Sequence, residues 1–159
     1  MTLVELRKEH SISQIEASKI LNVPERTYRR YENDESYGSK IKREMFVKKI
    51  NDHFEITEEK GFLTIKQIKE VVKKIFDEEY EGHIDFCYLF GSYAKGLENE
   101  KSDVDLYVSS SLHGLRFVGL IERLRQTLHK KVDLIRSSEL ENNIELVNVI
   151  MKDGIKIYG

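Results

Sequence analysis

Asp103 and Asp105, two carboxylates separated by one residue, stand at the start of the apolar run VDLYV. Side chains alternate between the two faces of a strand, so both carboxylates are predicted to lie on one face. Carboxylates held this close repel each other unless water or a divalent cation lies between them. Mg²⁺ favours one or two carboxylates that leave room for water and phosphate oxygens. The spacing therefore predicts a magnesium site suited to phosphoryl or nucleotidyl transfer.

A Gly-Ser pair precedes Asp103 by ten residues. Gly91 lets the backbone approach a ligand closely, and Ser92 can begin a helix whose free N–H groups point at an anion. Lys95, one helical turn further on, could neutralise phosphate oxygens or could be an ordinary surface lysine. Ser102 could orient Asp103 by a hydrogen bond or could simply cap the turn. Together these residues predict a phosphate cradle beside the carboxylates.

Apolar runs and amphipathic stretches alternate along residues 65–159, and these elements must position the candidate site. The predicted order is a helix over 65–76, a strand over 86–90, a short helix after Ser92 ending at Gly96, a strand over 104–108, a helix over 115–128, a strand over 132–135, a helix over 139–150 and a strand over 155–158. This alternation predicts an α/β fold. Cys87 lies in the first strand, where we expect a core residue rather than a nucleophile. Tyr93, next to Ser92, could line a nucleotide base or pack on the surface.

The motifs GSYAKG, SDVDL and KKVDLIR and the closing MKDGIKIYG resemble the nucleotidyltransferase superfamily related to DNA polymerase beta. Its signature is Gly-Ser, about ten residues, Asp-x-Asp and a third acidic residue on a later strand. Here that third residue is Asp133, although the sequence does not show that its strand neighbours the strand of Asp103 and Asp105. The details are most similar to the minimal nucleotidyltransferase antitoxins that are paired with HEPN toxins.

This resemblance implies a minimal nucleotidyltransferase fold with a small mixed sheet. It implies that Asp103, Asp105 and Asp133 are catalytic and bind two Mg²⁺ ions, with Asp133 holding the second ion or acting as a base. It implies that Gly91, Ser92, Lys95 and Ser102 bind the nucleotide. The implied reaction transfers AMP from ATP to a tyrosine of a cognate HEPN-type ribonuclease toxin and silences that toxin.

Two other functions remain open at this stage. In one, the protein is a transcriptional regulator or binding antitoxin whose nucleotidyltransferase fold senses nucleotide or docks a partner without turnover. In the other, AMP is transferred to a small molecule such as an aminoglycoside. Residues 65–159 are too few to include a separate acceptor domain, which disfavours a small-molecule acceptor. We therefore expect the acceptor surface to come from another molecule or from a second copy of the chain.

Residues 1–58 carry apolar positions at helical spacing, with Ile12, Ile15 and Ile20 among them. Ser13 and Glu16 form a predicted capping box, and Pro24 suits the first position of the next helix. Asn22 stands in the turn between the two helices, where it tolerates left-handed geometry. Ser39 is expected to cap a further helix whose core-facing residues are Ile41, Met45, Ile50 and Phe54. This is an all-α helix-turn-helix pattern.

The same segment is similar to the DNA-binding helix-turn-helix of the phage repressor and XRE class. The residues that carry the resemblance are Leu6, Ser13, Gln14, Glu16, Leu21, Val23, Thr27, Arg30, Tyr31, Glu32 and Asn33. The resemblance implies a recognition helix over 24–31 that binds promoter DNA. The implied DNA-binding residues are Gln14, Arg26, Thr27, Arg29 and Arg30. Specific binding would require a dimer or larger homo-oligomer.

Composition sets the remaining expectations. The 159 residues are expected to form a helix-turn-helix domain over 1–58, a linker over 59–64 and a catalytic domain over 65–159. Net charge is −2, and residues 1–58 contain eleven basic and eleven acidic residues, so any basic patch must be local. The single cysteine suits a reducing cytoplasm, where we expect the protein to reside. No apolar run approaches the roughly 20 residues of a membrane span, and the first ten residues lack the apolar core of a signal peptide.

Overall fold

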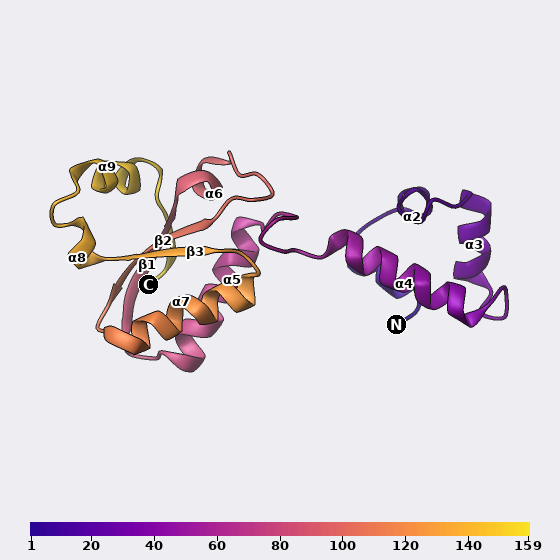
Figure 1. Ribbon diagram of the computed structural model, residues 1–159, viewed down its shortest axis with the longest axis horizontal. Coiled ribbons are helices and arrows are strands. Elements are labelled where there is room, and N and C mark those ends of the chain that lie inside the picture. Colours follow the sequence, from indigo (N-terminus) through magenta and orange to yellow (C-terminus); the bar gives the residue numbers. More distant parts are fainter. The chain divides into compact units, whose positions relative to one another are not determined.

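The computed structural model describes all residues, 1–159, and divides the chain into two compact units, Met1–Glu55 and Ile56–Gly159 (Figure 1). The division falls three residues before the end of the expected first domain at 58. The segment 59–64, expected to be a linker, lies within the second unit. None of the helices combines the length and the apolar character that crossing a bilayer requires.

The first unit contains four helices: α1 (Leu3–Glu9), α2 (Gln14–Leu21), α3 (Glu25–Asn33) and α4 (Lys40–Phe54). The predicted capping box is confirmed, because the Ser13 side chain accepts from the Glu16 amide and the Glu16 carboxylate accepts from the Ser13 amide. Asn22 adopts the expected left-handed conformation, with φ of 55°. Pro24 is the N-cap of α3 rather than its first residue, and Ser39 caps α4 as predicted.

Two residues predicted to face the core of this unit, Ile41 (72%) and Met45 (52%), are instead exposed, and so is Ile15 (48%). The face of α4 that packs inward carries Phe46 and Ile50, which are one turn apart. Residues 41 and 45 form the neighbouring stripe of the helix, rotated by one residue toward solvent. The buried residues of this unit are Leu3, Leu6, Ala17, Leu21, Tyr28, Tyr31, Phe46 and Ile50.

The second unit is a mixed four-stranded sheet with helices. Its elements are α5 (Ile65–Glu79), β1 (Ile84–Phe90), α6 (Gly91–Lys95), β2 (Val104–Ser110), α7 (Gly114–Leu128), β3 (Val132–Arg136), α8 (Ser137–Leu140), α9 (Ile144–Asp153) and β4 (Ile155–Tyr158). The strand order is β3-β2-β1-β4, and only β2 and β3 are parallel. The predicted fold class is therefore confirmed: an all-α module is followed along the chain by an α/β unit with a small mixed sheet.

The prediction of a single helix over 139–150 was wrong, because the chain forms α8 and α9 with a turn between them. Asn143 explains the second start, since its side chain accepts from the Leu146 amide and caps α9. A polar residue that can cap a helix competes with continuing the preceding one.

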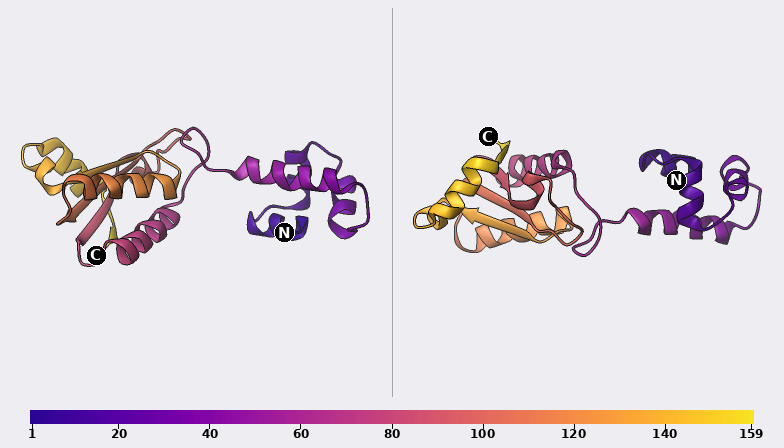
Figure 2. Two further views of the ribbon diagram at one scale, coloured as in Figure 1. Left: turned by 60° about the horizontal axis from the view of Figure 1, so that its bottom comes forward. Right: turned by 90° about the horizontal axis from the view of Figure 1, so that it is seen from above.

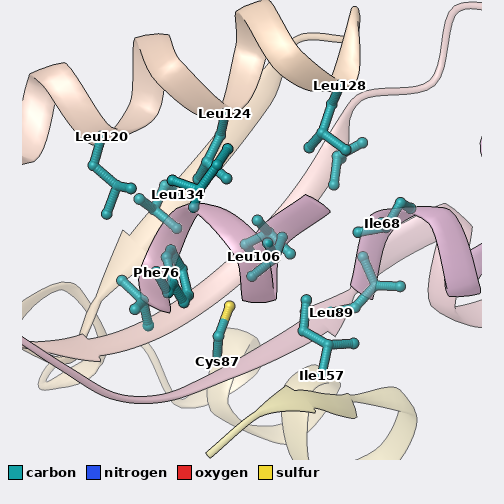
Figure 3. Packing of buried hydrophobic residues seen from close by; sticks show 14 of the residues in the cluster. Ile68, Phe76, Cys87, Leu89, Leu106, Leu120, Leu124, Leu128, Leu134 and Ile157 are labelled. Carbon is teal, nitrogen blue, oxygen red and sulfur yellow. The ribbon is translucent and has the colours of Figure 1, made fainter. Parts of the chain in front are cut away.

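Helices α5 and α7 pack side by side against one face of the sheet (Figures 1 and 2). The alternating inward residues of the strands meet the apolar stripes of the two helices there, as Figure 3 shows for Leu89, Leu106 and Leu124. Cys87 lies in this core with no exposed surface, and burial raises the pKa of its thiol, which confirms the expectation of an inert core residue. Asp105 on β2 and Asp133 on β3 occupy strand positions that point away from this layer.

Candidate active site and DNA-binding helix

Asp105 and Asp133 are direct partners in the parallel pairing of β2 with β3. Neighbouring strands lie about 4.8 Å apart, so the two carboxylates project from adjacent positions. Val104 and Leu106 are buried in the core, which places Asp105 on the opposite face of the sheet. Asp103 is exposed just before the strand, two residues from Asp105. The structure therefore brings Asp133 beside Asp105 and Asp103, which precede it in the chain by 28 and 30 residues.

The partly buried Asp105 carboxyl is the electrostatic centre of this group. Its burial, together with the negative charges of Asp133 and Asp103, raises its pKa to about 6. The charged form is disfavoured because water is withdrawn and like charges are close. A divalent cation at this position would offset the negative charges of all three carboxylates and would favour the charged form of Asp105.

The donor set fits Mg²⁺ as a shared ion rather than as a closed protein cage. No three His, Cys, Asp or Glu side chains converge closely enough to enclose a metal by themselves. Mg²⁺ commonly takes one or two carboxylates and completes its shell with water and substrate phosphate oxygens. Asp105 and Asp103 supply such oxygens, and Asp133 lies beside them on β3.

Gly91 is needed for the carboxylate of Asp105 as well as for the turn. It begins α6 with φ of 72°, a left-handed conformation that strains other residues. A Cβ atom there would lie 2.1 Å from Oδ2 of Asp105, so only glycine leaves room for that side chain. The sequence predicted that the backbone at Gly91 lies close to a ligand, and the structure shows that it also lies close to the Asp105 side chain. Gly96 ends α6 in a left-handed conformation, as expected.

The other candidate nucleotide-binding residues are less free than the sequence suggested. The Lys95 ammonium lies 3.8 Å from the Asp153 carboxylate at the end of α9. The Ser102 hydroxyl accepts a 2.8 Å bond from the Asn99 amide, so it caps the turn. Tyr93 is 1% exposed and packs in the core, so it neither lines a nucleotide base nor packs on the surface. Ser92 is partly exposed in α6, next to Gly91.

In the first unit, Arg26, Arg29 and Arg30 are all exposed along α3. Arg29 pairs with Glu25 at 2.5 Å, and the Arg30 guanidinium lies 4.7 Å from the centre of the Tyr37 ring. Arg26 has no such partner. The two other candidates, Thr27 on α3 and Gln14 at the start of α2, are partly exposed. The exposed arginines supply donors that suit phosphate or guanine edges.

Two arginines that the sequence analysis did not single out hold α3 in place. Arg7 on α1 binds the buried Glu32 carboxylate on α3 at 2.8 Å. Arg43 on α4 donates to the backbone carbonyls of Tyr31 and Asp34 at the end of α3. Neither arginine differs in local sequence from a surface residue, so only the packing of the helices identifies them.

Residues 66–159 match the family model described as polymerase beta nucleotidyltransferase. The match covers more than half of the chain, and the protein belongs to this family. Residues 3–40 match the helix-turn-helix family model.

Two similar proteins come from Methanocaldococcus jannaschii. "Putative protein adenylyltransferase MJ1379" is 36% identical over 86 residues, which are 50% of this chain and 84% of that protein. "Putative protein adenylyltransferase MJ0128" is 36% identical over 84 residues, with the same two shares covered.

The chain is also similar to parts of solved structures. A crystal structure described as the toxin-antitoxin with AMP-PNP gives a TM-score of 0.49 at 24% identity, covering 57% of this chain and 73% of that one. A structure of the tri-AMPylated Shewanella oneidensis HEPN toxin in complex with MNT antitoxin gives a TM-score of 0.46 at 21% identity, covering 59% of this chain and 71% of that one.

Proposed function

We propose that the second unit is a magnesium-dependent nucleotidyltransferase that transfers AMP from ATP to a protein hydroxyl. The observation that carries this proposal is the pairing of Asp105 with Asp133 on adjacent strands, close to Asp103 and to Gly91, where a Cβ atom would overlap the Asp105 carboxylate. Membership of the nucleotidyltransferase family supports the reaction class. The names of the two curated relatives support a protein acceptor rather than a small molecule.

Each residue has a role in this proposal. Asp103 and Asp105 would hold Mg²⁺, and bound Mg²⁺ would offset the charge of the triphosphate. The start of α6 at Gly91 and Ser92 faces the phosphates with its free N–H groups. The acceptor oxygen bonds to the α-phosphorus of ATP, and the bond from that phosphorus to the bridging oxygen breaks. Pyrophosphate leaves with the electron pair, and the hydroxyl proton passes to the Asp133 carboxylate.

The acceptor we propose is a tyrosine of a HEPN-type ribonuclease toxin, and modification there would silence the toxin. This assignment rests on the resemblance of GSYAKG, SDVDL and KKVDLIR to minimal nucleotidyltransferase antitoxins. The protein then acts as an antitoxin by covalent modification. The competing function is a regulator or antitoxin that binds its partner without transferring AMP.

We also propose that the first unit binds promoter DNA through α3. The exposed Arg26, Arg29 and Arg30 on one helix, in a unit with balanced charge, support a local rather than general basic surface. The match to the helix-turn-helix family supports the same function. Binding of the system's own promoter would couple antitoxin concentration to its synthesis.

Intact-mass spectrometry tests the transfer. The protein, ATP, Mg²⁺ and the purified product of the neighbouring gene are mixed, and the partner should gain the mass of one or more AMP units. The Asp133→Ala variant should still bind the partner and leave it unmodified, because this carboxylate acts in chemistry and not in docking. A partner that stays unmodified, yet is neutralised by tight binding to the wild-type protein, would favour the regulator or binding antitoxin.

A further inference from the structure

Lys130 is a buried cation that the proposed reaction does not use. It lies in the turn between α7 and β3 with 0% of its surface exposed, whereas the adjacent Lys131 is exposed. Burial lowers the pKa of Lys130, and the nearby carboxylates of Glu100, Glu59 and Glu58 oppose that shift. A buried ammonium is costly unless hydrogen bonds replace its water, so its bonding partners indicate what it does.

The ammonium joins two backbone segments. It donates a 2.5 Å bond to the carbonyl of Glu100 and a 3.3 Å bond to the carbonyl of Lys60. Glu100 belongs to the loop 97–102, which leads from α6 into Asp103. Lys60 belongs to the segment 56–63, which we call the strap; it folds back on itself through pairing of Thr57 with Lys60.

The strap is fastened to the same region by further contacts. Its Gly61 amide donates to the Glu100 carboxylate at 3.4 Å, and Glu59 pairs with Lys101 at 3.2 Å. These ionic groups are exposed and contribute little individually. Lys130 is the buried member of the set, and it donates to the Glu100 carbonyl, whereas the Lys60 carbonyl also accepts from the Thr57 amide at 2.8 Å.

The loop that accepts from Lys130 and the turn that carries Lys130 both lead directly to the carboxylates. Glu100 stands three residues before Asp103, and Lys130 itself stands three residues before Asp133. Between them, the Val104 amide donates to the Lys131 carbonyl at 2.9 Å and begins the pairing of β2 with β3. One side chain therefore ties the entry of β2 to the entry of β3.

We propose that Lys130 is a positioning residue that fixes Asp103 relative to Asp105 and Asp133, and so sets the affinity for metal-bound nucleotide. This inference rests on the proposed nucleotidyltransferase function. An apolar side chain of similar length would fill the same space but would release the Glu100 carbonyl, and the loop 97–102 would loosen. Displacement of a ligand by about 1 Å is enough to lose most of its contribution to a site.

The test compares Lys130→Met with Lys131→Met, a matched control at the neighbouring exposed position. Isothermal titration of each full-length protein with Mg²⁺ and an ATP analogue that has a methylene group between the α- and β-phosphates measures binding without transfer. Urea denaturation in EDTA measures stability separately. We expect Lys130→Met to bind the nucleotide at least about tenfold more weakly, with stability in EDTA near that of wild type, and Lys131→Met to bind within about twofold of wild type. Lys130→Arg, which keeps a charged donor, should recover part of the affinity.

Equal affinity in Lys130→Met and Lys131→Met, with wild type binding normally, would overturn the positioning role alone. Failure of the wild type to bind the metal-bound nucleotide would instead count against the proposed function. If Lys130→Met does not fold, Lys130→Gln decides in the same titration. A position that tolerates neither substitution without unfolding would also overturn the inference, because Lys130 would then serve folding and not the site.

Discussion

Replacing Asp105 by asparagine should stabilise the metal-free protein at neutral pH and remove its response to Mg²⁺ and ATP. Asparagine keeps the shape of the side chain beside Gly91 but carries no charge. The ionised Asp105 carboxylate is partly buried and faces Asp133 and Asp103, so it is held at a cost when no cation is present. A residue retained despite such a cost is expected at a functional site.

The magnitude follows from the pKa of Asp105, which rises from 3.8 to about 6 in the folded protein. At about 1.4 kcal/mol for each pKa unit, the upper bound is about 3 kcal/mol. Because the side chain keeps contact with solvent, screening reduces the expected difference to about 1–2 kcal/mol. The sign is fixed by linkage: a raised folded pKa gives stability that is complete below pH 3.8 and is lost as pH rises through about 6.

Urea denaturation followed by circular dichroism, in EDTA at pH 4 and at pH 8, measures this difference. The free energy of unfolding of Asp105→Asn should exceed that of wild type by about 1–2 kcal/mol at pH 8 and by little at pH 4. Asp85→Asn is the control, since Asp85 is exposed on β1 at the opposite end of that strand from Phe90, which pairs with Asp105. Its effect should be small and the same at both pH values.

Addition of Mg²⁺ and ATP should then reverse the order of stability. Ligand that binds only the folded state stabilises wild type, and Asp105→Asn should gain little. The reasoning is refuted if Asp105→Asn is less stable than wild type at pH 8 in EDTA, or if the difference is the same at both pH values. An equal gain of both proteins from Mg²⁺ and ATP would remove Asp105 from the metal site.

Gly91→Ala should lower the free energy of unfolding by about 2–4 kcal/mol, because strain at positive φ is added to overlap with Asp105; Gly96→Ala, whose new Cβ meets nothing, should cost only about 1 kcal/mol in the same denaturation experiment. Asp133→Ala should lower the rate of AMP transfer by at least about a hundredfold in a radiolabel assay while leaving partner binding intact, and normal transfer would exclude it as the base. Arg26→Ala should weaken promoter binding by about 1–3 kcal/mol in fluorescence anisotropy at fixed salt, with transfer unchanged; wild-type protein that ignores the promoter at low salt would make the first unit a partner-docking module.

Local patterns in the sequence were sufficient to predict many of the helices, strands and helix caps of this protein. The alternation of side chains along a strand placed Asp105 away from the core, although Asp103 lies just before β2 begins, and the strand over 155–158 matches β4. The caps at Ser13 and Ser39 were also predictable, because a cap depends on residues three positions apart. These features are set by neighbours along the chain, which a single sequence contains.

Contacts between distant segments were decided only by the tertiary structure. The pairing of β2 with β3 placed Asp133 opposite Asp105, and the sequence held no signal for that register. Burial of Tyr93 and exposure of Met45 depend on how a helix is rotated against its neighbours, which a shift of one residue changes by about 100°. Lys130 and Lys131 are adjacent and identical in type, yet only Lys130 is buried. The environment of a side chain is set by the residues that pack against it. The sequence therefore shows which residue types are present, and only the tertiary structure shows which of them are buried and which are exposed.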